Sequence, residues 1–138
     1  MIWRGPAGWG EWSPFLDYAG NELVPWLRAA DEAAEHSWPA PLRTEIAVNS
    51  TVPTVGPEEA YGIARAAGCG TAKVKVAERG QALTDDAARL EAVRDALGTG
   101  GKLRIDANGG WSVEEALAAI KQLSHFDLEY VEQPCATV

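Results

Sequence analysis

From residue 42 onward, strand-like and helix-like segments alternate along the chain, and this rhythm limits the fold more than any other feature. Strand-like runs begin at Ile46 and recur at residues 71–76, 102–106 and 128–132. The segments between them have the apolar spacing of amphipathic helices. Strand–helix units of about 30 residues build parallel sheets with right-handed crossovers. The pattern therefore predicts an α/β fold, either an open doubly wound sheet or part of a barrel.

Local signals mark where the helices begin and end. Pro57 suits the first position of a helix that Gly68 ends, and Thr84 is expected to cap the next helix. Ser112, with Glu115 three residues later, has the pattern of a capping box. In that last helix we expect an inward face made of Val113, Leu117, Ile120 and Leu123. No Gly-x-Gly-x-x-Gly follows a predicted strand, so a dinucleotide-binding fold loses its main support.

Residues 1–41 have a different character and predict a separate small domain that packs on the sheet. The first 26 residues are rich in tryptophan, and Asn21 is placed to cap a helix. Leu23, Leu27, Ala30 and Ala34 would share one face of that helix. Pro39 and Pro41 then mark a linker. We therefore expect a domain boundary between residues 41 and 42.

Charge and composition exclude several classes of function. The net charge of −8 argues against nucleic acid and against an anionic membrane surface, because both need clustered positive charge. No apolar run is long enough for a membrane span, and the N-terminus lacks the layout of a signal peptide. Cys69 and Cys135 have neither the number nor the spacing of a disulfide framework or a zinc site. These features predict a cytoplasmic protein.

Polar side chains follow three successive predicted strands at the point where each strand ends. They are Lys73 and Lys75, Asp106 and Asn108, and Glu132, each group about one strand–helix unit after the last. The carboxyl ends of parallel strands meet at one edge of the sheet, which is where barrel enzymes have their active sites. We therefore expect these side chains to converge.

The residue types at this edge point to metal-assisted proton transfer. Lys73 and Lys75 share one strand face, and crowding in a dry interior lowers a lysine pKa toward the range of a general base. Asp106 and Glu132 supply the oxygen ligands that Mg²⁺ prefers. Plainer interpretations are that the lysines protect a solvated edge strand, that Asp106 is a turn residue, and that Glu132 is a solvated strand end.

Several segments resemble the enolase superfamily, and within it the actinobacterial type of the o-succinylbenzoate synthase family. The Lys73-x-Lys75 pair, the Asp-Ala-Asn run ending at Asn108 and the Val-Glu-Gln-Pro run around Glu132 stand in the order and register of that superfamily. The other matching segments are Gly8–Glu11, Ser13–Phe15, Asn49–Pro53 and Glu129–Cys135. The resemblance covers nearly the whole chain beyond Gly5.

The resemblance implies a role for each residue at the sheet edge. Lys75 would be the acid/base lysine, and Lys73 would sit behind it and depress its pKa. Asp106 and Glu132 would hold Mg²⁺, with Asn108 supporting them. The implied reaction is dehydration of a small carboxylate, 2-succinyl-6-hydroxy-2,4-cyclohexadiene-1-carboxylate, to o-succinylbenzoate on the route to menaquinone.

The resemblance also implies an organisation for the chain. Residues 1–41 would be part of an α+β capping domain whose loop at Ser13 and Phe15 closes over substrate, and residues 42–138 would be the first half of a (β/α) TIM-type barrel, with about four of its strands. Family members also have a further metal-binding acid and a second lysine, which are not recognisable here. We therefore expect a fragment that is inactive alone and self-associates through an open sheet edge.

Other functions remain compatible with the same residues. N-acylamino acid racemisation, dipeptide epimerisation and muconate-type cycloisomerisation use the same strand-end groups, with specificity set elsewhere. The chain could also be a non-catalytic remnant, or an assembly partner that completes a barrel with another polypeptide. A stand-alone doubly wound binding domain would need a ligand site at a strand-order switch point.

Overall fold

The computed structural model describes residues 1–137. This part of the chain divides into two compact units, with the boundary in the sequence after Ile46. The first unit covers residues 1–46, and the second begins at Ala47. The sequence pattern placed the boundary at residue 41, just after the paired prolines. Among the described residues, none of the helices has the length and apolar character needed to cross a membrane.

The first unit is a β-hairpin packed against one helix. Strands β1 (Ile2–Arg4) and β2 (Trp9–Glu11) are antiparallel, and a 3₁₀ turn η1 (Gly20–Glu22) leads into helix α1 (Leu23–Glu35). Ala30 and Ala34 form the buried stripe of α1. A side chain on Gly5 or Gly10 would collide with the backbone carbonyls of these alanines. Small residues on both sides therefore let the helix and the hairpin approach closely.

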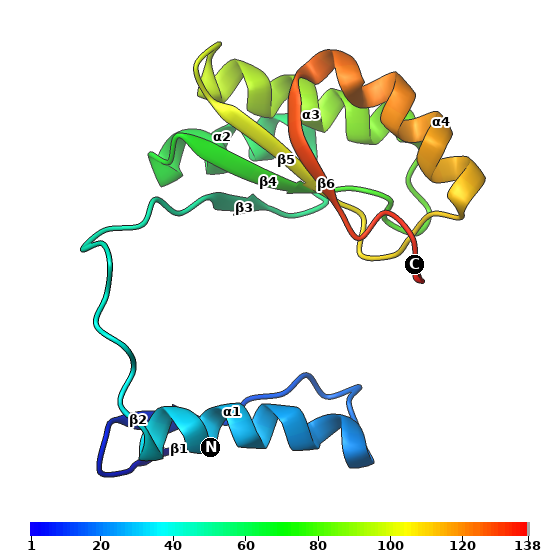
Figure 1. Ribbon diagram of the computed structural model, residues 1–138. Coiled ribbons are helices and arrows are strands. Elements are labelled where there is room, and N and C mark those ends of the chain that lie inside the picture. Colours follow the sequence, from blue (N-terminus) through cyan, green and yellow to red (C-terminus); the bar gives the residue numbers. More distant parts are fainter. Residues whose placement is uncertain (138) are drawn as a thin grey trace. The chain divides into compact units, whose positions relative to one another are not determined.

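The second unit is a parallel sheet with helices between successive strands (Figure 1). Its described strands stand side by side in sequence order, β3-β4-β5-β6, and are all parallel. In chain order its elements are β3 (Ser50–Val52), α2 (Pro57–Ala67), β4 (Thr71–Lys75), α3 (Leu83–Leu97), β5 (Lys102–Asp106), α4 (Val113–Leu123), η2 (Ser124–Phe126) and β6 (Leu128–Glu132).

Within the described residues, helices α2, α3 and α4 all lie on the same face of this sheet (Figure 1). A doubly wound sheet would reverse its strand order and place helices on both faces. Consecutive strand order with helices on one face is instead the arrangement of a (β/α) barrel wall. The expected α/β fold with barrel-type strand order is therefore confirmed, and the doubly wound alternative is not.

The core of the second unit lies between the sheet and its helices. Val52, Val74 and Ile105 point from three strands into this layer and are fully buried, and Leu90 and Val93 of α3 pack against them. Side chains alternate along each strand, so the residues next to these in sequence occupy the opposite face. That alternation places the lysines and acids predicted as functional on the face away from the helices.

The helix boundaries follow most of the local signals. Pro57 is the first residue of α2, and Gly68 ends this helix in the left-handed conformation at φ 63°. At the start of α4 the capping box is formed, with the Glu115 amide donating to the Ser112 hydroxyl over 3.3 Å. Helix α3 begins at Leu83, one residue before the expected cap at Thr84, because the Asp85 carboxylate accepts the Ala82 amide at 2.7 Å.

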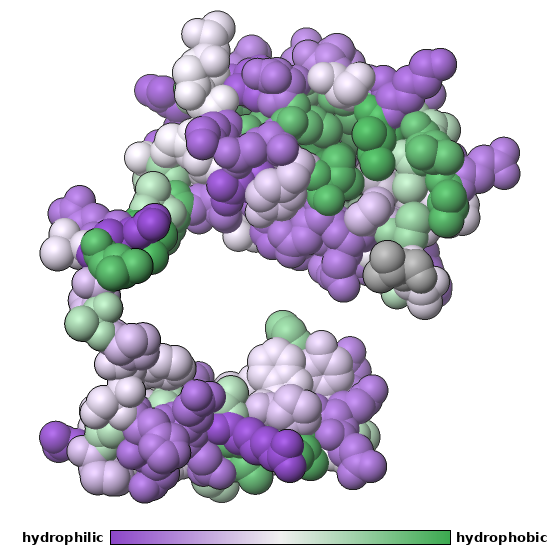
Figure 2. All heavy atoms as spheres, in the orientation of Figure 1, coloured by the Kyte–Doolittle hydropathy of each residue, from purple (hydrophilic) through white to green (hydrophobic). Residues whose placement is uncertain are grey.

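The inward face predicted for α4 is wrong for Val113 and Leu117, whereas Leu123 is buried as expected. Val113 and Leu117 are 65% and 67% exposed, and Figure 2 shows hydrophobic surface over α4. Besides Leu123, the helix buries Ala116 and Ala119, which were not predicted to face inward. Neighbouring positions on a helix point about 100° apart. The alanine face therefore displaces the leucine face, since small side chains allow the closer approach to the sheet.

Candidate active site

Strand register aligns the predicted functional residues across the sheet. Lys75 of β4 pairs with Asp106 of β5, and Asp106 pairs with Glu132 of β6. One pleat earlier, Lys73 pairs with Arg104. Because side chains alternate and the strands are parallel, these residues project from the same face near the carboxyl ends of their strands. The convergence expected from the sequence is present in the structure.

Two lysines and two carboxylates form one hydrogen-bonded cluster. The Lys75 ammonium donates to Asp106 Oδ2 and to Asn108 Oδ1, both at 2.6 Å. The Lys73 ammonium contacts both Glu132 oxygens, at 2.9 and 3.0 Å, and lies 3.2 Å from Asp106 Oδ2. Asp106 Oδ2 is therefore held between two ammonium groups, and Lys73 bridges the two acids. We call these five residues the lysine–acid cluster.

Strand position and burial exclude the plainer interpretations of three members of this cluster. β4 lies between β3 and β5, so its lysines do not protect a solvated edge strand. Asp106 is the last residue of β5 and its side chain is 1% exposed, so it is not a surface turn residue. The side chain of Glu132 is 38% exposed, which leaves this carboxylate accessible from solvent.

The electrostatics differ from the sequence-based expectation for Lys73. The hydrogen bond that Lys73 donates to Glu132 raises the pKa of Lys73, burial lowers it, and Asp106 raises it further, so the net direction is upward. Crowding by Lys75 was expected to lower the pKa of this lysine. For Lys73 the expectation is wrong because its ammonium has carboxylate partners on other strands, and a partner at hydrogen-bond distance outweighs the like charge beside it.

The pKa of Asp106 is lowered even though the side chain is buried. Burial alone would raise the pKa of this carboxyl, but the hydrogen bonds from Lys75, from the Asn108 amide and from Lys73 outweigh that effect. The Asn108 amide donates to Asp106 Oδ1 at 3.0 Å, and Asn108 adopts a left-handed backbone conformation at φ 47°. Asp106 is thus an ionised carboxylate at neutral pH, held rigidly on both oxygens.

The carboxylates of Asp106 and Glu132 share one cationic partner, the Lys73 ammonium. Both approach the Lys73 ammonium, which shows that their oxygens converge on one point of positive charge. The Asn108 amide oxygen, which accepts from Lys75, is a further side-chain oxygen in the cluster. In residues 1–137, His, Cys, Asp and Glu side chains form no group of three or more that could hold a metal ion. The chain's own oxygens would thus fill part of an octahedral Mg²⁺ shell, which ordinarily keeps several waters.

Below this cluster lies a second polar layer that the sequence analysis did not identify as functional. Arg104 donates to Glu129 at 2.6 Å and to Asn49 at 3.0 Å, and its guanidinium lies 5.0 Å from the centre of the Tyr130 ring. Lys102 also pairs with Glu129, at 2.9 Å. The alternation that places Asp106 on this face also places Arg104 there, and that signal was available in the sequence. This layer joins β3, β5 and β6 beneath the reactive groups.

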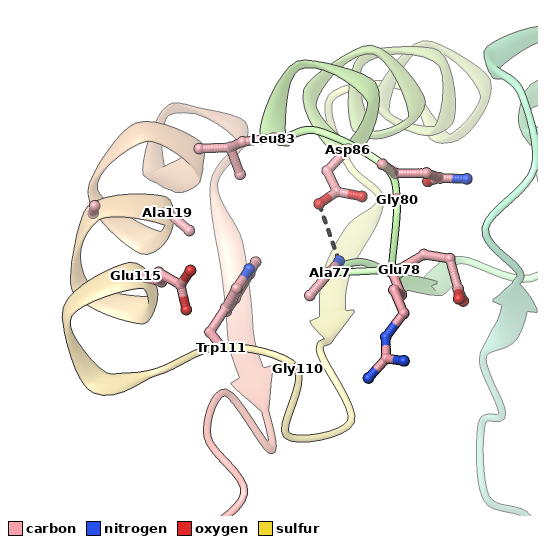
Figure 3. A pocket seen from close by; sticks show the side chains of 12 residues that line it. Ala77, Glu78, Gly80, Leu83, Asp86, Gly110, Trp111, Glu115 and Ala119 are labelled. Carbon is pink, nitrogen blue, oxygen red and sulfur yellow. Dashed lines mark hydrogen bonds between the residues drawn. The ribbon is translucent and has the colours of Figure 1, made fainter.

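A hollow of about 370 Å³ opens beside Lys75 at the carboxyl end of the sheet. Two members of the lysine–acid cluster, Lys75 and Asn108, line this hollow. The other lining residues are Pro53, Thr54, Val76, Ala77, Glu78, Ala107 and Gly110. A neighbouring pocket of about 410 Å³ lies between the loop after β4 and helix α4, with Trp111, Leu83 and Glu115 on its wall (Figure 3). No member of the lysine–acid cluster lines that second pocket, so the first hollow is the candidate substrate site.

The two residues expected to lie near substrate belong to the first unit. The Ser13 hydroxyl donates to the Glu11 carboxylate at 2.9 Å. Phe15 is 68% exposed, and its ring meets Tyr18 edge-on at 6.0 Å. Their approach to the lysine–acid cluster stays a prediction.

Comparisons with known proteins agree with this geometry. The model of the enolase C-terminal domain-like family matches residues 57–138, and that of the enolase N-terminal domain-like family matches residues 1–34. The chain is 60% identical, over all of its length, to an o-succinylbenzoate synthase of Thermobifida fusca, and 51% identical over 97% to one of Mycolicibacterium smegmatis. It spans 44% and 41% of the length of these relatives.

Solved structures show the same fold. The L-Ala-D/L-Glu epimerase of Bacillus subtilis in complex with a substrate matches with a TM-score of 0.59 and 35% identity, over 65% of this chain and 26% of the epimerase. A racemase of Streptomyces coelicolor with bound magnesium matches with a TM-score of 0.55 and 29% identity, over 64% and 28%. Strand-end lysines and acids on a barrel wall, together with family matches across both units, show that this chain belongs to the enolase superfamily.

Proposed function

We propose that this chain carries the proton-transfer groups of an o-succinylbenzoate synthase, which dehydrates 2-succinyl-6-hydroxy-2,4-cyclohexadiene-1-carboxylate. The observation that carries the proposal is the lysine–acid cluster, in which Lys75 faces an open hollow beside Asp106 and Asn108. The 60% identity to the Thermobifida fusca synthase supports this substrate. Because the chain spans 44% and 41% of the length of these relatives, the complete synthase reaction is assigned to it only as part of this proposal.

The chemistry asks two things of Lys75. As the free amine, its Nζ removes the proton from the ring carbon that bears the carboxylate. The resulting ammonium then donates that proton to the departing hydroxyl group, which leaves as water, so the ring becomes aromatic and the atoms balance. Lys75 is suited to both steps because its side chain is 29% exposed and borders the hollow while its backbone belongs to a rigid inner strand.

Asp106 and Glu132 would hold Mg²⁺, in keeping with the magnesium-bound racemase of the same fold. When bound, Mg²⁺ supplies Lewis-acid stabilisation of negative charge on the substrate carboxylate. Asn108 would fix the Asp106 carboxylate through its backbone amide, and Lys73 would hold Glu132 in place. Arg104, Tyr130 and Asn49 would form the polar floor under the substrate.

The test measures Mg²⁺-dependent formation of o-succinylbenzoate with two variants. Lys75→Ala should abolish turnover, whereas Lys102→Ala, at the opposite end of the neighbouring strand and 63% exposed, should leave it unchanged. The assay is run on the chain alone and on the chain mixed with the remaining part of the Thermobifida fusca relative. Turnover in neither arm, or turnover that survives Lys75→Ala, would contradict the proposal.

Magnesium binding is tested separately by calorimetry, without substrate. Asp106→Asn and Glu132→Gln should each weaken binding about tenfold or more, the usual scale for altering a metal site. Glu129→Gln is the matched control, because this acid lies on the same strand as Glu132 but pairs with Lys102 and Arg104. Equal weakening by all three substitutions would show that binding is non-specific.

A second candidate is epimerisation of a dipeptide, favoured by the 35% identity to the Bacillus subtilis epimerase. The same Lys75 would remove a proton next to a carboxylate, but no water would leave. Exchange of the substrate α-proton with deuterium from solvent, measured with L-Ala-L-Glu, distinguishes the two reactions. We expect no exchange with the dipeptide and turnover only with the cyclohexadiene carboxylate.

Self-association is also part of the proposal. In the described sheet, β3 and β6 are the end strands, and an unpaired strand edge presents backbone groups to other chains. We expect sedimentation velocity to show species larger than the monomer at micromolar concentration. A monomer across that range would contradict this expectation.

A further inference from the structure

Helix α3 carries a buried ion pair that the proposed chemistry does not use. Arg89 is 1% exposed and Asp86, one turn earlier, is 2% exposed, and the Arg89 Nη1 lies 2.8 Å from Asp86 Oδ1. Burying two charges is costly unless further hydrogen bonds satisfy them. A buried arginine with a full set of partners therefore marks a place where the fold holds several segments together.

The partners of Arg89 are backbone and amide oxygens at the carboxyl end of the sheet. Its Nε donates to the Val55 carbonyl at 2.7 Å, and its Nη1 donates to the Lys75 carbonyl at 3.1 Å. Its Nη2 donates to the Gln81 side chain. These oxygens belong to the loop after β3, the last residue of β4 and the loop after β4. One guanidinium thus ties both loops to the residue that carries the proposed acid/base amine.

Asp86 holds the backbone two residues after Lys75. Its Oδ2 accepts the Ala77 amide at 3.0 Å, a bond drawn in Figure 3. Ala77 adopts a left-handed backbone conformation at φ 61°, which is unfavourable for a residue with a Cβ. The buried carboxylate stabilises this turn directly after Lys75. The Lys75 carbonyl and the Ala77 amide are consequently both held from the helix side.

We propose that Arg89 and Asp86 are positioning residues that set the location of the Lys75 ammonium. The catalytic role of Lys75 in this inference rests on the proposed function. The anchoring of the backbone at Lys75 and Ala77 by Arg89 and Asp86 does not depend on it. Lys75 reaches Asp106 and Asn108 at 2.6 Å from a backbone whose carbonyl is held by Arg89. If that anchor is lost, the end of β4 relaxes and the amine no longer meets its partners on β5.

The same helix offers a matched control. Arg94 also donates to backbone carbonyls, those of Gly101 at 2.6 Å and Phe126 at 2.7 Å. These carbonyls precede β5 and β6, at the opposite end of the sheet from Lys75. Arg94→Lys therefore removes an equivalent fork of hydrogen bonds from the same helix without touching the end of β4.

The experiment compares Arg89→Lys with Arg94→Lys by NMR of lysine labelled with ¹³C at the ε carbon. The unsubstituted sequence has four lysines, Lys73, Lys75, Lys102 and Lys121, and each variant adds one more, whose signal is identified by comparison with the unsubstituted spectrum. A lysine keeps the charge beside Asp86 but lacks the planar fork that reaches several acceptors. In the unsubstituted protein the two ε protons of Lys75 should be inequivalent. Arg89→Lys should merge them, whereas Arg94→Lys should leave them separate.

A second readout is exchange of the Ala77 amide with deuterium. Loss of a buried hydrogen bond typically corresponds to about a tenfold or larger change in an opening equilibrium. Asp86→Asn and Arg89→Lys should therefore speed exchange at Ala77 by about tenfold relative to Ile105 in the core. An unchanged Lys75 signal and unchanged Ala77 exchange in folded Arg89→Lys would overturn the proposal. If Arg89→Lys does not fold, Asp86→Asn decides by the same two readouts.

Turnover adds a third arm and separates this inference from the proposed function. Misplacing a reacting group by about 1 Å costs up to about a hundredfold in rate, so Arg89→Lys should lower kcat by at least about tenfold while KM changes little. Arg94→Lys should lower the melting temperature but not kcat. If no variant and no unsubstituted protein turns over substrate, the proposed function fails, while the NMR and exchange results still decide the positioning role.

Discussion

Replacing Asp106 with asparagine is the most direct test of how the lysine–acid cluster is held. The substitution keeps the size of the side chain and removes its charge. Asp106 Oδ2 now lies 2.6 Å from the Lys75 ammonium and 3.2 Å from the Lys73 ammonium. In the variant, the amide oxygen can accept from both lysines only if its NH₂ group replaces Oδ1, where it would face the Asn108 amide, a donor against a donor. Two ammonium groups would then remain beside each other without a buried counter-charge.

The expected loss of stability follows from these contacts. Breaking a buried ion pair by removing one partner costs about 3–5 kcal/mol. The side chains of Lys73 and Lys75 are 19% and 29% exposed, so both ammonium groups recover some hydration. Lys73 also keeps its bonds to Glu132. We therefore expect Asp106→Asn to lower the free energy of unfolding by about 2–3 kcal/mol at neutral pH, below the full cost of an isolated buried charge.

The loss should depend on pH in a defined direction. The pKa of Asp106 lies below its ordinary value in the folded protein, where the lysines and the Asn108 amide outweigh burial. A carboxyl with a lowered folded pKa contributes stability above its unfolded pKa and loses it as the pH falls through the folded pKa. The difference between the unsubstituted protein and Asp106→Asn should thus be full at neutral pH and should shrink below about pH 4, near the unfolded pKa.

Amide hydrogen exchange at Leu103 and Ile105 measures this difference, because both residues are fully buried in β5 and open only with the sheet. Asp95→Asn is the matched control, since Asp95 is exposed on α3. A loss under about 0.5 kcal/mol, the range of neutral surface substitutions, would refute the reasoning. So would a loss of the same size at pH 7 and pH 3, because the charge of Asp106 would then not be its cause.

Three further predictions concern packing and capping in the second unit. Leu90→Ala should lower the free energy of unfolding by about 3 kcal/mol in urea titrations, because Leu90 is fully buried in the core. Gly110→Ala should cost about 1–3 kcal/mol, since the new Cβ would lie 2.9 Å from the Ala77 carbonyl oxygen; an unchanged urea midpoint would contradict the close approach. Ser112→Ala should cost about 1 kcal/mol by loss of the cap to the Glu115 amide, and Ser112→Asp should restore it.

Much of the second unit could be predicted because its signals are local or periodic. Pro57, Gly68 and the Ser112–Glu115 box act through neighbours in the chain, so their effects do not depend on what the helix later contacts. The convergence of Lys75, Asp106 and Glu132 was predictable because parallel strands place their carboxyl ends at one edge. The strand–helix rhythm alone left a doubly wound sheet and a barrel open, and the observed strand order with helices on one face decided for the barrel wall.

The pairing and burial of individual side chains could not be predicted. Val113 and Leu117 have the spacing of a buried face, yet an alanine face packs closer to the sheet. Arg89 has no feature in the sequence that separates it from a solvated helix arginine. Its burial follows from two backbone carbonyls, of Val55 and Lys75, and the Gln81 side chain, which the fold brings to one point. The upward pKa of Lys73 likewise needed the position of Glu132 on another strand.

The sequence alone thus determined which residues carry charge and where strands and helices begin, because these depend on side-chain chemistry and short-range backbone bonds. Tertiary structure decided which charges meet. Lys75 could have faced Lys73 alone, but the register of β4 with β5 placed Asp106 within 2.6 Å of it. Coulombic interactions fall steeply with distance and strengthen with burial, so ångström-scale placement sets their strength. Only the folded sheet supplies that placement.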